Sequence, residues 1–163
     1  MNTRTTARLV ILGPDESLLM MRIQAEDGDA ASESIWTTLG GGVERGESIL
    51  GAAERELFEE TGIVGAKVGP ILWFGEQIIR RQGADVWVKE HFVLVRTQSV
   101  SLSTQGWSAA ERTAIAELKW WNFGELRGSK QTIKPPGYLR LVEPLLHDCA
   151  PLEPPIQIKL SDC

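Results

Sequence analysis

Three glutamates, Glu56, Glu59 and Glu60, are the residues of this sequence whose type and spacing point most directly to chemistry. They occupy positions i, i+3 and i+4, and on an α-helix these positions share one face. Carboxylates this close repel one another, at a cost of a few tenths of a kcal/mol for an i,i+4 pair. A bound cation would remove that repulsion. Hard oxygen ligands in this number suit Mg²⁺ or Mn²⁺, and Mg²⁺ commonly acts on substrates that carry phosphates.

A helix and a glycine-rich loop are the elements that must position these glutamates. Residues 48–61 are expected to be helical, and Gly62 stands where a left-handed C-terminal cap belongs. Residues 40–42, ahead of the helix, are three consecutive glycines. Glycine permits positive φ and lets the backbone approach a ligand closely. The loop and the helix face together therefore predict a ligand site.

Most of the remaining chain has patterns typical of β-strands. Residues 7–12 and 17–23 predict a hairpin across a Gly-Pro-Asp turn. Residues 68–79 and 84–97, rich in Val, Ile, Trp and Phe, predict a longer antiparallel hairpin. This order of strands around a helix predicts an α/β fold with a mixed sheet and helices on both sides. Shorter strands are expected at 35–39 and 118–121, helical segments at 108–116, 123–126 and 136–147, and a surface loop at 25–34.

Length and composition predict one domain and exclude several functions. The 163 residues, of which 42% are hydrophobic, suit a single domain over residues 1–148. A proline-rich C-terminal tail follows at 149–163, in which residues 156–160 alternate like an edge strand that can pair across a homodimer. The net charge of −5 and the absence of a basic stripe argue against binding to duplex nucleic acid. The chain shows neither a signal peptide nor a membrane-spanning run, and two cysteines without a metal-ligand pattern fit reduced thiols, so a cytoplasmic protein is expected.

A longer motif extends through the glycines and the helix. Gly41 is followed after five residues by Glu47, and after seven more by Arg55-Glu56-Leu57-Phe58-Glu59-Glu60-Thr61-Gly62-Ile63. This motif closely resembles the Nudix box, the signature of the Nudix hydrolase family. Every defined position is filled, so a chance match is improbable. Trp36 and the Trp-Trp pair at 120–121 extend the likeness over most of residues 7–147.

The resemblance implies a fold and a reaction. The family fold is an α/β/α sandwich with a mixed sheet. The family reaction is metal-assisted hydrolysis of a diphosphate bond in a nucleoside diphosphate linked to another group, with water attacking phosphorus. The expected protein is therefore a Mg²⁺-dependent pyrophosphohydrolase acting on acid anhydrides, with Mn²⁺ as a second candidate metal and a small nucleotide-type molecule as substrate.

Matching the motif residue by residue implies roles for the glutamates. Glu59 and Glu60 are the first choices as metal ligands, and the backbone carbonyl of Gly41 is a further ligand in the family. Glu56 stays open between metal ligand and general base. Catalysis is expected to depend on Glu56, Glu59 and Arg55.

The same matching implies a structural clamp between Glu47 and Arg55. The planar guanidinium of an arginine binds a carboxylate with two hydrogen bonds, which suits Arg55 to hold the loop against the helix. Without the motif, this pair would be read as a surface salt bridge worth about 0–1 kcal/mol.

Four further residues are weaker candidates. Glu117, and after it Glu111, are candidates for an extra carboxylate of the metal site supplied from beyond the sheet. Arg22 is a candidate for a phosphate contact, and Trp36 for stacking on a base. Their ordinary roles would be exposed charges and, for Trp36, core packing.

Two alternatives to a hydrolase remain, and the substrate stays open. A non-hydrolytic Nudix-fold nucleotide-binding or sensor module would be favoured by a degenerate box, whereas this box is intact. An isomerase on the same fold would need a cysteine in the core, whereas Cys149 and Cys163 lie in the tail. Leu39 stands where the family usually has a proline, which changes no ligand. Marks of the ADP-ribose, dinucleoside polyphosphate and coenzyme A subfamilies are absent, so a nucleoside triphosphate, including one with an oxidised base, is the preferred substrate.

Overall fold

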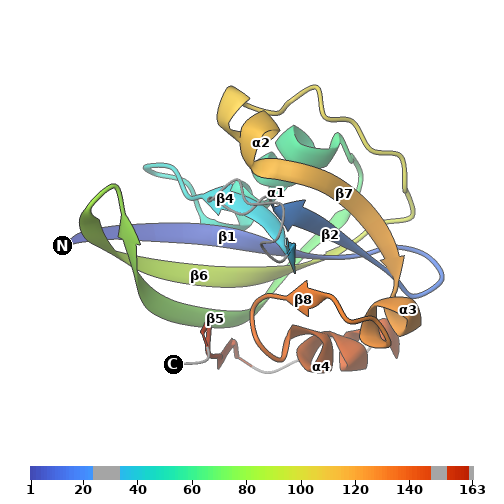
Figure 1. Ribbon diagram of the computed structural model, residues 1–163. Coiled ribbons are helices and arrows are strands. Elements are labelled where there is room, and N and C mark those ends of the chain that lie inside the picture. Colours follow the sequence, from blue (N-terminus) through green and yellow to red (C-terminus); the bar gives the residue numbers. More distant parts are fainter. Residues whose placement is uncertain (24–33, 148–153, 162–163) are drawn as a thin grey trace.

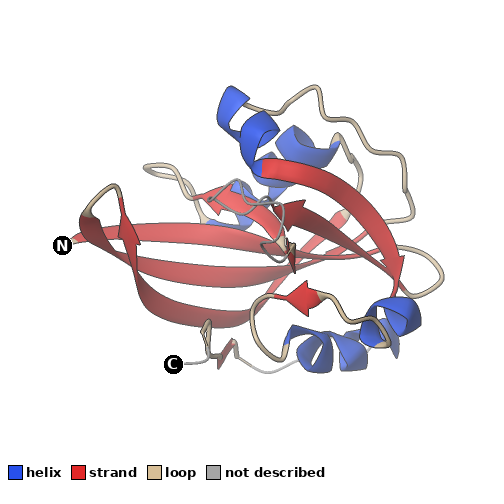
Figure 2. Cartoon of the chain, viewed as in Figure 1, coloured by secondary structure: helices blue, strands red, loops and turns tan. Residues whose placement is uncertain are grey.

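The computed structural model describes residues 1–23, 34–147 and 154–161. Within these residues, nine strands form one sheet, and helices lie against both of its faces (Figure 1 and Figure 2). The strands are β1 (Asn2–Leu12), β2 (Ser17–Ile23), β3 (Ile35–Thr37), β4 (Leu39–Gly42), β5 (Lys67–Arg81), β6 (Ala84–Arg96), β7 (Ile115–Asn122), β8 (Thr132–Ile133) and β9 (Ile156–Gln157). The helices are α1 (Ile49–Thr61), α2 (Ala109–Ala114), α3 (Phe123–Arg127), α4 (Tyr138–Val142) and a 3₁₀ helix, η1 (Glu143–His147).

The sheet is mixed, with strand order β8-β3-β2-β1-β6-β5-β9. β1 pairs in parallel with β6 along its whole length, while β5 and β6 form the long antiparallel hairpin. The other edge of β1 is shared, because β4 pairs with its middle and β2 with its C-terminal end. The sheet therefore opens beside β1, and the short glycine strand β4 lies in this opening.

Two hydrophobic cores lie on opposite faces of the sheet. Since successive side chains of a strand point to opposite faces, β1 contributes Leu9 and Ile11 to one core and Val10 to the other. The first core is covered by α1, and the second by α3, α4 and η1. The predicted α/β fold with a mixed sheet and helices on both sides is thus confirmed.

The helix α1 has defined ends. The hydroxyl of Ser48 caps its first turn by accepting the N–H of Gly51 at 3.0 Å. Gly62 ends it with φ 72°, and its N–H donates to the carbonyl of Phe58 at 2.8 Å. Both ends agree with the helix predicted from residues 48–61.

Several predicted boundaries differ from the structure. β1 begins at Asn2, because hydrogen bonding to β6 continues past the apolar residues. The three glycines form part of β4. The last predicted helix is split into α4 and η1, with Pro144 in the 3₁₀ segment. The strand β8 carries no local signal and was not predicted.

Some sequence predictions concern residues outside the described ranges. The loop at 25–34 falls there except for its last residue, as do both cysteines and the start of the tail. β9 pairs with β5 of the same chain. Among the described residues, no helix is long and apolar enough to cross a membrane.

The buried hydroxyl of Tyr138 gives a prediction about stability. Its side chain is 1% exposed, and its oxygen has no hydrogen-bond partner among the described residues. Burial raises the pKa of this phenol. A buried group without a partner costs free energy, so Tyr138→Phe should leave the free energy of unfolding unchanged or raise it by about 1 kcal/mol in urea denaturation.

The control for this prediction is Tyr138→Ala. It removes the ring that packs edge-on against Trp73 at 6.1 Å and should cost about 3–5 kcal/mol. A loss of stability in Tyr138→Phe as large as in the alanine variant would contradict the prediction.

Candidate active site

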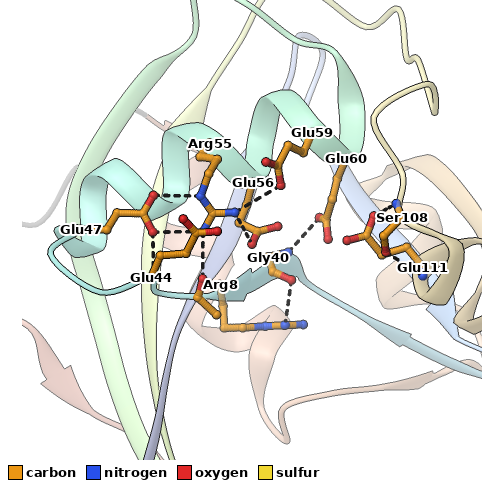
Figure 3. A network of polar contacts seen from close by, with 11 residues as sticks. Arg8, Gly40, Glu44, Glu47, Arg55, Glu56, Glu59, Glu60, Ser108 and Glu111 are labelled. Carbon is orange, nitrogen blue, oxygen red and sulfur yellow. Dashed lines mark hydrogen bonds and ion pairs between the residues drawn. The ribbon is translucent and has the colours of Figure 1, made fainter.

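Three carboxylates from two helices converge beside β4. Glu56 and Glu60 on α1 and Glu111 on α2 each offer an oxygen, and these oxygens lie within 4.8 Å of one another (Figure 3). Glu56 is 6% exposed and Glu60 is 2% exposed. Arg55 pairs with Glu56 but not with Glu60 or Glu111, so the negative charge of the group is only partly balanced. Carboxylate oxygens at this spacing fit a hard divalent cation.

The glycines of β4 bring the backbone against these carboxylates. The N–H of Gly40 donates to Glu60 Oε2 at 2.9 Å, and Gly40 has φ 129°. Gly41 faces Glu56 so closely that an added Cβ would lie 2.6 Å from the carboxylate carbon. A larger residue at Gly41 would displace the Glu56 carboxylate, and one at Gly40 would overlap the backbone carbonyl of Ala7 on β1.

Glu111 is positioned by a capping box at the start of α2. The Ser108 hydroxyl accepts the N–H of Glu111 at 3.2 Å, while Glu111 Oε2 accepts the N–H of Ser108 at 3.0 Å. The preceding residue, Trp107, donates its indole N–H to the carbonyl of Glu60 at 2.8 Å. The loop before α2 is therefore attached to the end of α1 that carries Glu60.

Arg55 connects the loop, the helix and the acidic group. Its Nε and Nη2 donate to the two oxygens of Glu47 at 2.8 and 3.0 Å, and Nη2 also donates to the carbonyl of Gly42 at 2.9 Å. Its Nη1 donates to Glu56 at 2.9 Å and to Glu59 at 3.2 Å (Figure 3). One guanidinium thus orients three carboxylates and one strand.

Burial and hydrogen bonding separate the pKa values of these carboxylates. Burial raises the pKa of Glu60 to about 8, although the N–H of Gly40 and the charge of Arg8 oppose the shift. Burial also raises the pKa of Glu56, against the effect of Arg55. Hydrogen bonds from Arg55 lower the pKa of Glu47. The two buried carboxylates therefore resist ionisation until a positive charge is supplied.

The remaining predicted residues lie outside the three-carboxylate group. Glu59 is partly exposed and pairs with Arg55. Glu117 on β7 pairs with Arg22 on β2 at 3.2 Å. Trp36 is 3% exposed; its ring meets Trp121 edge-on at 5.2 Å, and its indole N–H donates to Gln131 at 3.1 Å, so its side chain belongs to the core.

Two residues of this region were undervalued or missed in the sequence. Glu111 ranked below Glu117, although the pattern Ser108-x-x-Glu111 is itself a capping-box signal that fixes a helix start. Arg8 was not singled out; an arginine within the otherwise apolar run at 7–12 was the available signal. Its guanidinium donates to the Thr38 hydroxyl at 3.0 Å, to the Thr38 carbonyl, and to the Gly40 carbonyl at 3.3 Å.

A cavity of about 300 Å³ lies beside Arg8 on the face of the sheet opposite α1. Arg8, Glu90 and Phe92 form its floor, because β1 and β6 pair in register there. Thr37, Thr38, Gln77, Lys134, Pro135, Leu160 and Ser161 complete its lining. The cavity thus combines hydrogen-bonding groups with apolar walls, as small-molecule sites do.

The burial of Glu60 predicts pH-dependent stability in the metal-free protein. The folded-state pKa of about 8 exceeds the ordinary value of 4.5, so the folded protein binds this proton more tightly than the unfolded chain does. This stabilising contribution is complete below pH 4.5, declines as the pH rises, and is lost above pH 8. In urea denaturation with a chelator, the free energy of unfolding should fall by about 2 kcal/mol between about pH 6 and about pH 9.

Glu60→Gln is the matched variant for this experiment, since it cannot titrate. Its free energy of unfolding should vary less over the same interval. A wild-type profile that stays flat, or one that the glutamine variant reproduces, would show that Glu60 is not buried with a raised pKa.

Arg55→Lys tests the guanidinium that joins these groups. Lysine keeps the charge but cannot form the paired bonds to Glu47 while also reaching Glu56. Loss of partners that orient metal ligands typically lowers metal affinity about 10- to 100-fold, which we expect for Mn²⁺ binding measured by calorimetry. Arg45→Lys is the control on the loop, and a variant at Arg55 with unchanged affinity would contradict this role.

Comparisons with known proteins agree with this geometry. A sequence profile described as the NUDIX domain matches residues 2–142. A search of curated proteins finds no match. Similar solved structures include the dihydroneopterin triphosphate pyrophosphohydrolase of E. coli, at 18% identity and TM-score 0.62 over 91% of this chain and 100% of that one. A NUDIX family hydrolase from Clostridium perfringens has 16% identity and TM-score 0.62 over 92% of this chain and 100% of that one. A mutator MutT protein from Bacillus halodurans has 18% identity and TM-score 0.60 over 98% of this chain and 91% of that one. These structures share the fold of this protein. Since the domain profile spans most of this chain, the chain belongs to the NUDIX domain family.

Proposed function

We propose that this protein is a Mg²⁺-dependent pyrophosphohydrolase that cleaves a diphosphate bond in a nucleoside diphosphate linked to another group. The observation that carries the proposal is the group formed by the buried Glu56 and Glu60 of an intact Nudix box and the half-buried Glu111. Clustered carboxylates whose mutual repulsion a bound metal ion would offset are suited to hold the cation that a phosphate substrate needs.

The proposed ligands are Glu60, Glu59, Glu56 and the carbonyl of Gly41. Mg²⁺ held there would neutralise charge on the bridging phosphates and polarise the phosphorus. Glu59 lies one turn from Arg55 and can reach the metal if it leaves that ion pair, which is partly exposed and therefore weak. We propose Glu111, in place of Glu117, as the extra carboxylate, because Glu111 lies in the group and Glu117 pairs with Arg22.

Glu56 is the proposed general base. Its carboxylate offers two oxygens, so one could bind the metal ion while the other accepts a proton from a water whose pKa the cation would lower. Arg55 donates to its Oε1 and so fixes the direction of the carboxylate. Water would attack phosphorus, Glu56 would take the proton, and the phosphate leaving group would depart.

The cavity beside Arg8 is the proposed position of the organic part of the substrate. Its polar groups suit a heterocycle that both donates and accepts hydrogen bonds. The similar fold of an E. coli enzyme named for a heterocyclic triphosphate supports a nucleoside triphosphate or a related compound as the substrate class. Arg22 could contact a phosphate only in competition with its ion pair to Glu117. At this exposure the ion pair is worth about 0–1 kcal/mol.

A panel of nucleotides tests this function. Purified protein with Mg²⁺ should release phosphate or pyrophosphate from at least one nucleoside triphosphate or nucleoside diphosphate derivative. Glu56→Gln should lower kcat by about 10²–10⁴-fold, as expected for loss of a general base. Glu59→Gln and Glu60→Gln should raise the Mg²⁺ concentration that activity requires.

Glu54→Gln is the control, because Glu54 is exposed on the same helix and takes no part in the network. Nucleotide binding with no turnover on any member of the panel would favour a binding or sensor module. An unchanged metal requirement in both ligand variants would overturn the ligand assignment.

A further inference from the structure

The last described residues of the chain, 156–161, run beside the cavity; we refer to them as the C-terminal segment. Ile156 and Gln157 form β9, which pairs in parallel with Trp73 and Phe74 of β5 (Figure 1, red strand next to β5). The N–H of Ile158 donates to the carbonyl of Phe74 at 2.8 Å. The segment is therefore attached to the sheet by backbone hydrogen bonds before it reaches Leu160.

Leu160 packs directly against Gly75, where a larger residue would leave no room for it. Its side chain is 7% exposed and packs in the core that contains Trp73, Phe92 and Tyr138. A Cβ added at Gly75 would lie 2.7 Å from Leu160 Cγ and 3.0 Å from the Ile158 carbonyl oxygen. Gly75 does not have positive φ, so its backbone conformation does not require glycine. The small size of Gly75 instead gives room for the C-terminal segment.

The C-terminal segment also contributes to the cavity. Leu160 and Ser161 line it together with Arg8, Glu90 and Phe92 of the sheet. The apolar side chains of Leu160 and Phe92 can contact the face of a heterocycle. Glu90 can accept hydrogen bonds from amino groups on its edge, as acidic side chains do with cytosine.

We propose that the C-terminal segment is a wall of the substrate cavity and that Leu160 is a specificity-determining residue, which contacts the base of a nucleotide substrate. This proposal rests on the proposed function, because it assumes that the organic part of the substrate occupies this cavity. It assigns the selection of the base to a part of the chain outside the Nudix box. The phosphates would be bound without help from this segment.

Binding measurements separate the two assignments. The full chain and its Leu160→Ala variant are titrated calorimetrically with AMP, GMP, CMP and UMP, and separately with pyrophosphate in the presence of Mg²⁺. Loss of a few methyl-sized groups from a site lowers affinity about 10-fold or more, which we expect for the nucleoside monophosphate that the wild type prefers. Affinity for pyrophosphate should stay unchanged. Lys159→Ala, at an exposed neighbouring position that does not line the cavity, should bind every ligand like the wild type.

Gly75→Ala is a second variant that keeps Leu160 but removes its space. Hydrogen exchange at the amide of Ile158 should become faster, which reports release of the segment, and the preference among bases should weaken as in Leu160→Ala. If exchange at Ile158 becomes faster in Gly75→Ala while the preference among bases stays unchanged, the proposal is overturned. An equal loss for pyrophosphate and nucleoside monophosphates would also overturn it, since the segment would then only support the fold.

The outcomes for the wild type keep this proposal distinct from the proposed function. If base-selective binding depends on Leu160 but no nucleotide of the panel is turned over, the role of Leu160 in base selection is supported and the proposed hydrolase activity is contradicted. If the protein turns over nucleotides but binds no nucleoside monophosphate selectively, or keeps its selectivity in Leu160→Ala, the hydrolase activity is supported and the role of the C-terminal segment in base selection is overturned.

Discussion

The burial of two carboxylates between α1 and β4 is the constraint on which the rest of this site depends. Glu56 and Glu60 lose most of their contact with water, and burial raises the pKa of both. Water is replaced only in part, by one N–H of Gly40 and by one branch of Arg55. Isolated buried charges are unfavourable, so the folded protein carries a local cost that a cation would remove. The neighbouring features can be understood as the means of keeping this arrangement in place.

Gly40 joins the two parts of the proposed site. Its N–H donates to Glu60 on the side of α1, and its carbonyl accepts from Arg8 on the side of the cavity. This residue has φ 129°, and a Cβ there would overlap the carbonyl of Ala7. The backbone of Gly40 therefore links the side chain of Glu60 among the carboxylates to the side chain of Arg8 at the cavity.

The sequence predicted most of the elements because their signals are local. The cap Ser48, the C-cap Gly62 and the apolar side of α1 depend on neighbours within a few residues. The N-terminal half of β1 is polar, and it is a strand only because β6, more than 80 residues later, pairs with it. The box likewise predicted the pairing of Arg55 with Glu47 through fixed spacing. Whether Glu111 or Glu117 lies next to Glu60 depends on the path of the chain after β6, and no local pattern decides it. The alternation at 156–160 predicted an edge strand, but its pairing with β5 and its place beside the cavity depend on distant residues such as Gly75, which has no positive φ to mark it.

The arginines beside the site form the counterpart of its carboxylates. Arg4 and Arg8 lie on the same face of β1, and burial together with the charges of Arg81 and Arg8 lowers the pKa of Arg4. The guanidinium of Arg4 donates no hydrogen bond to the described residues and lies beside Gly42, while the charges of Glu56 and Glu90 act to raise its pKa. Crowded guanidinium groups repel one another just as crowded carboxylates do, and each set is relieved by a ligand of opposite charge. In a chain whose net charge is −5, long-range electrostatic forces would repel an anionic substrate. Local positive charge is therefore needed where the phosphates would lie, and a cation on Glu56 and Glu60 beside Arg4 and Arg8 would supply it.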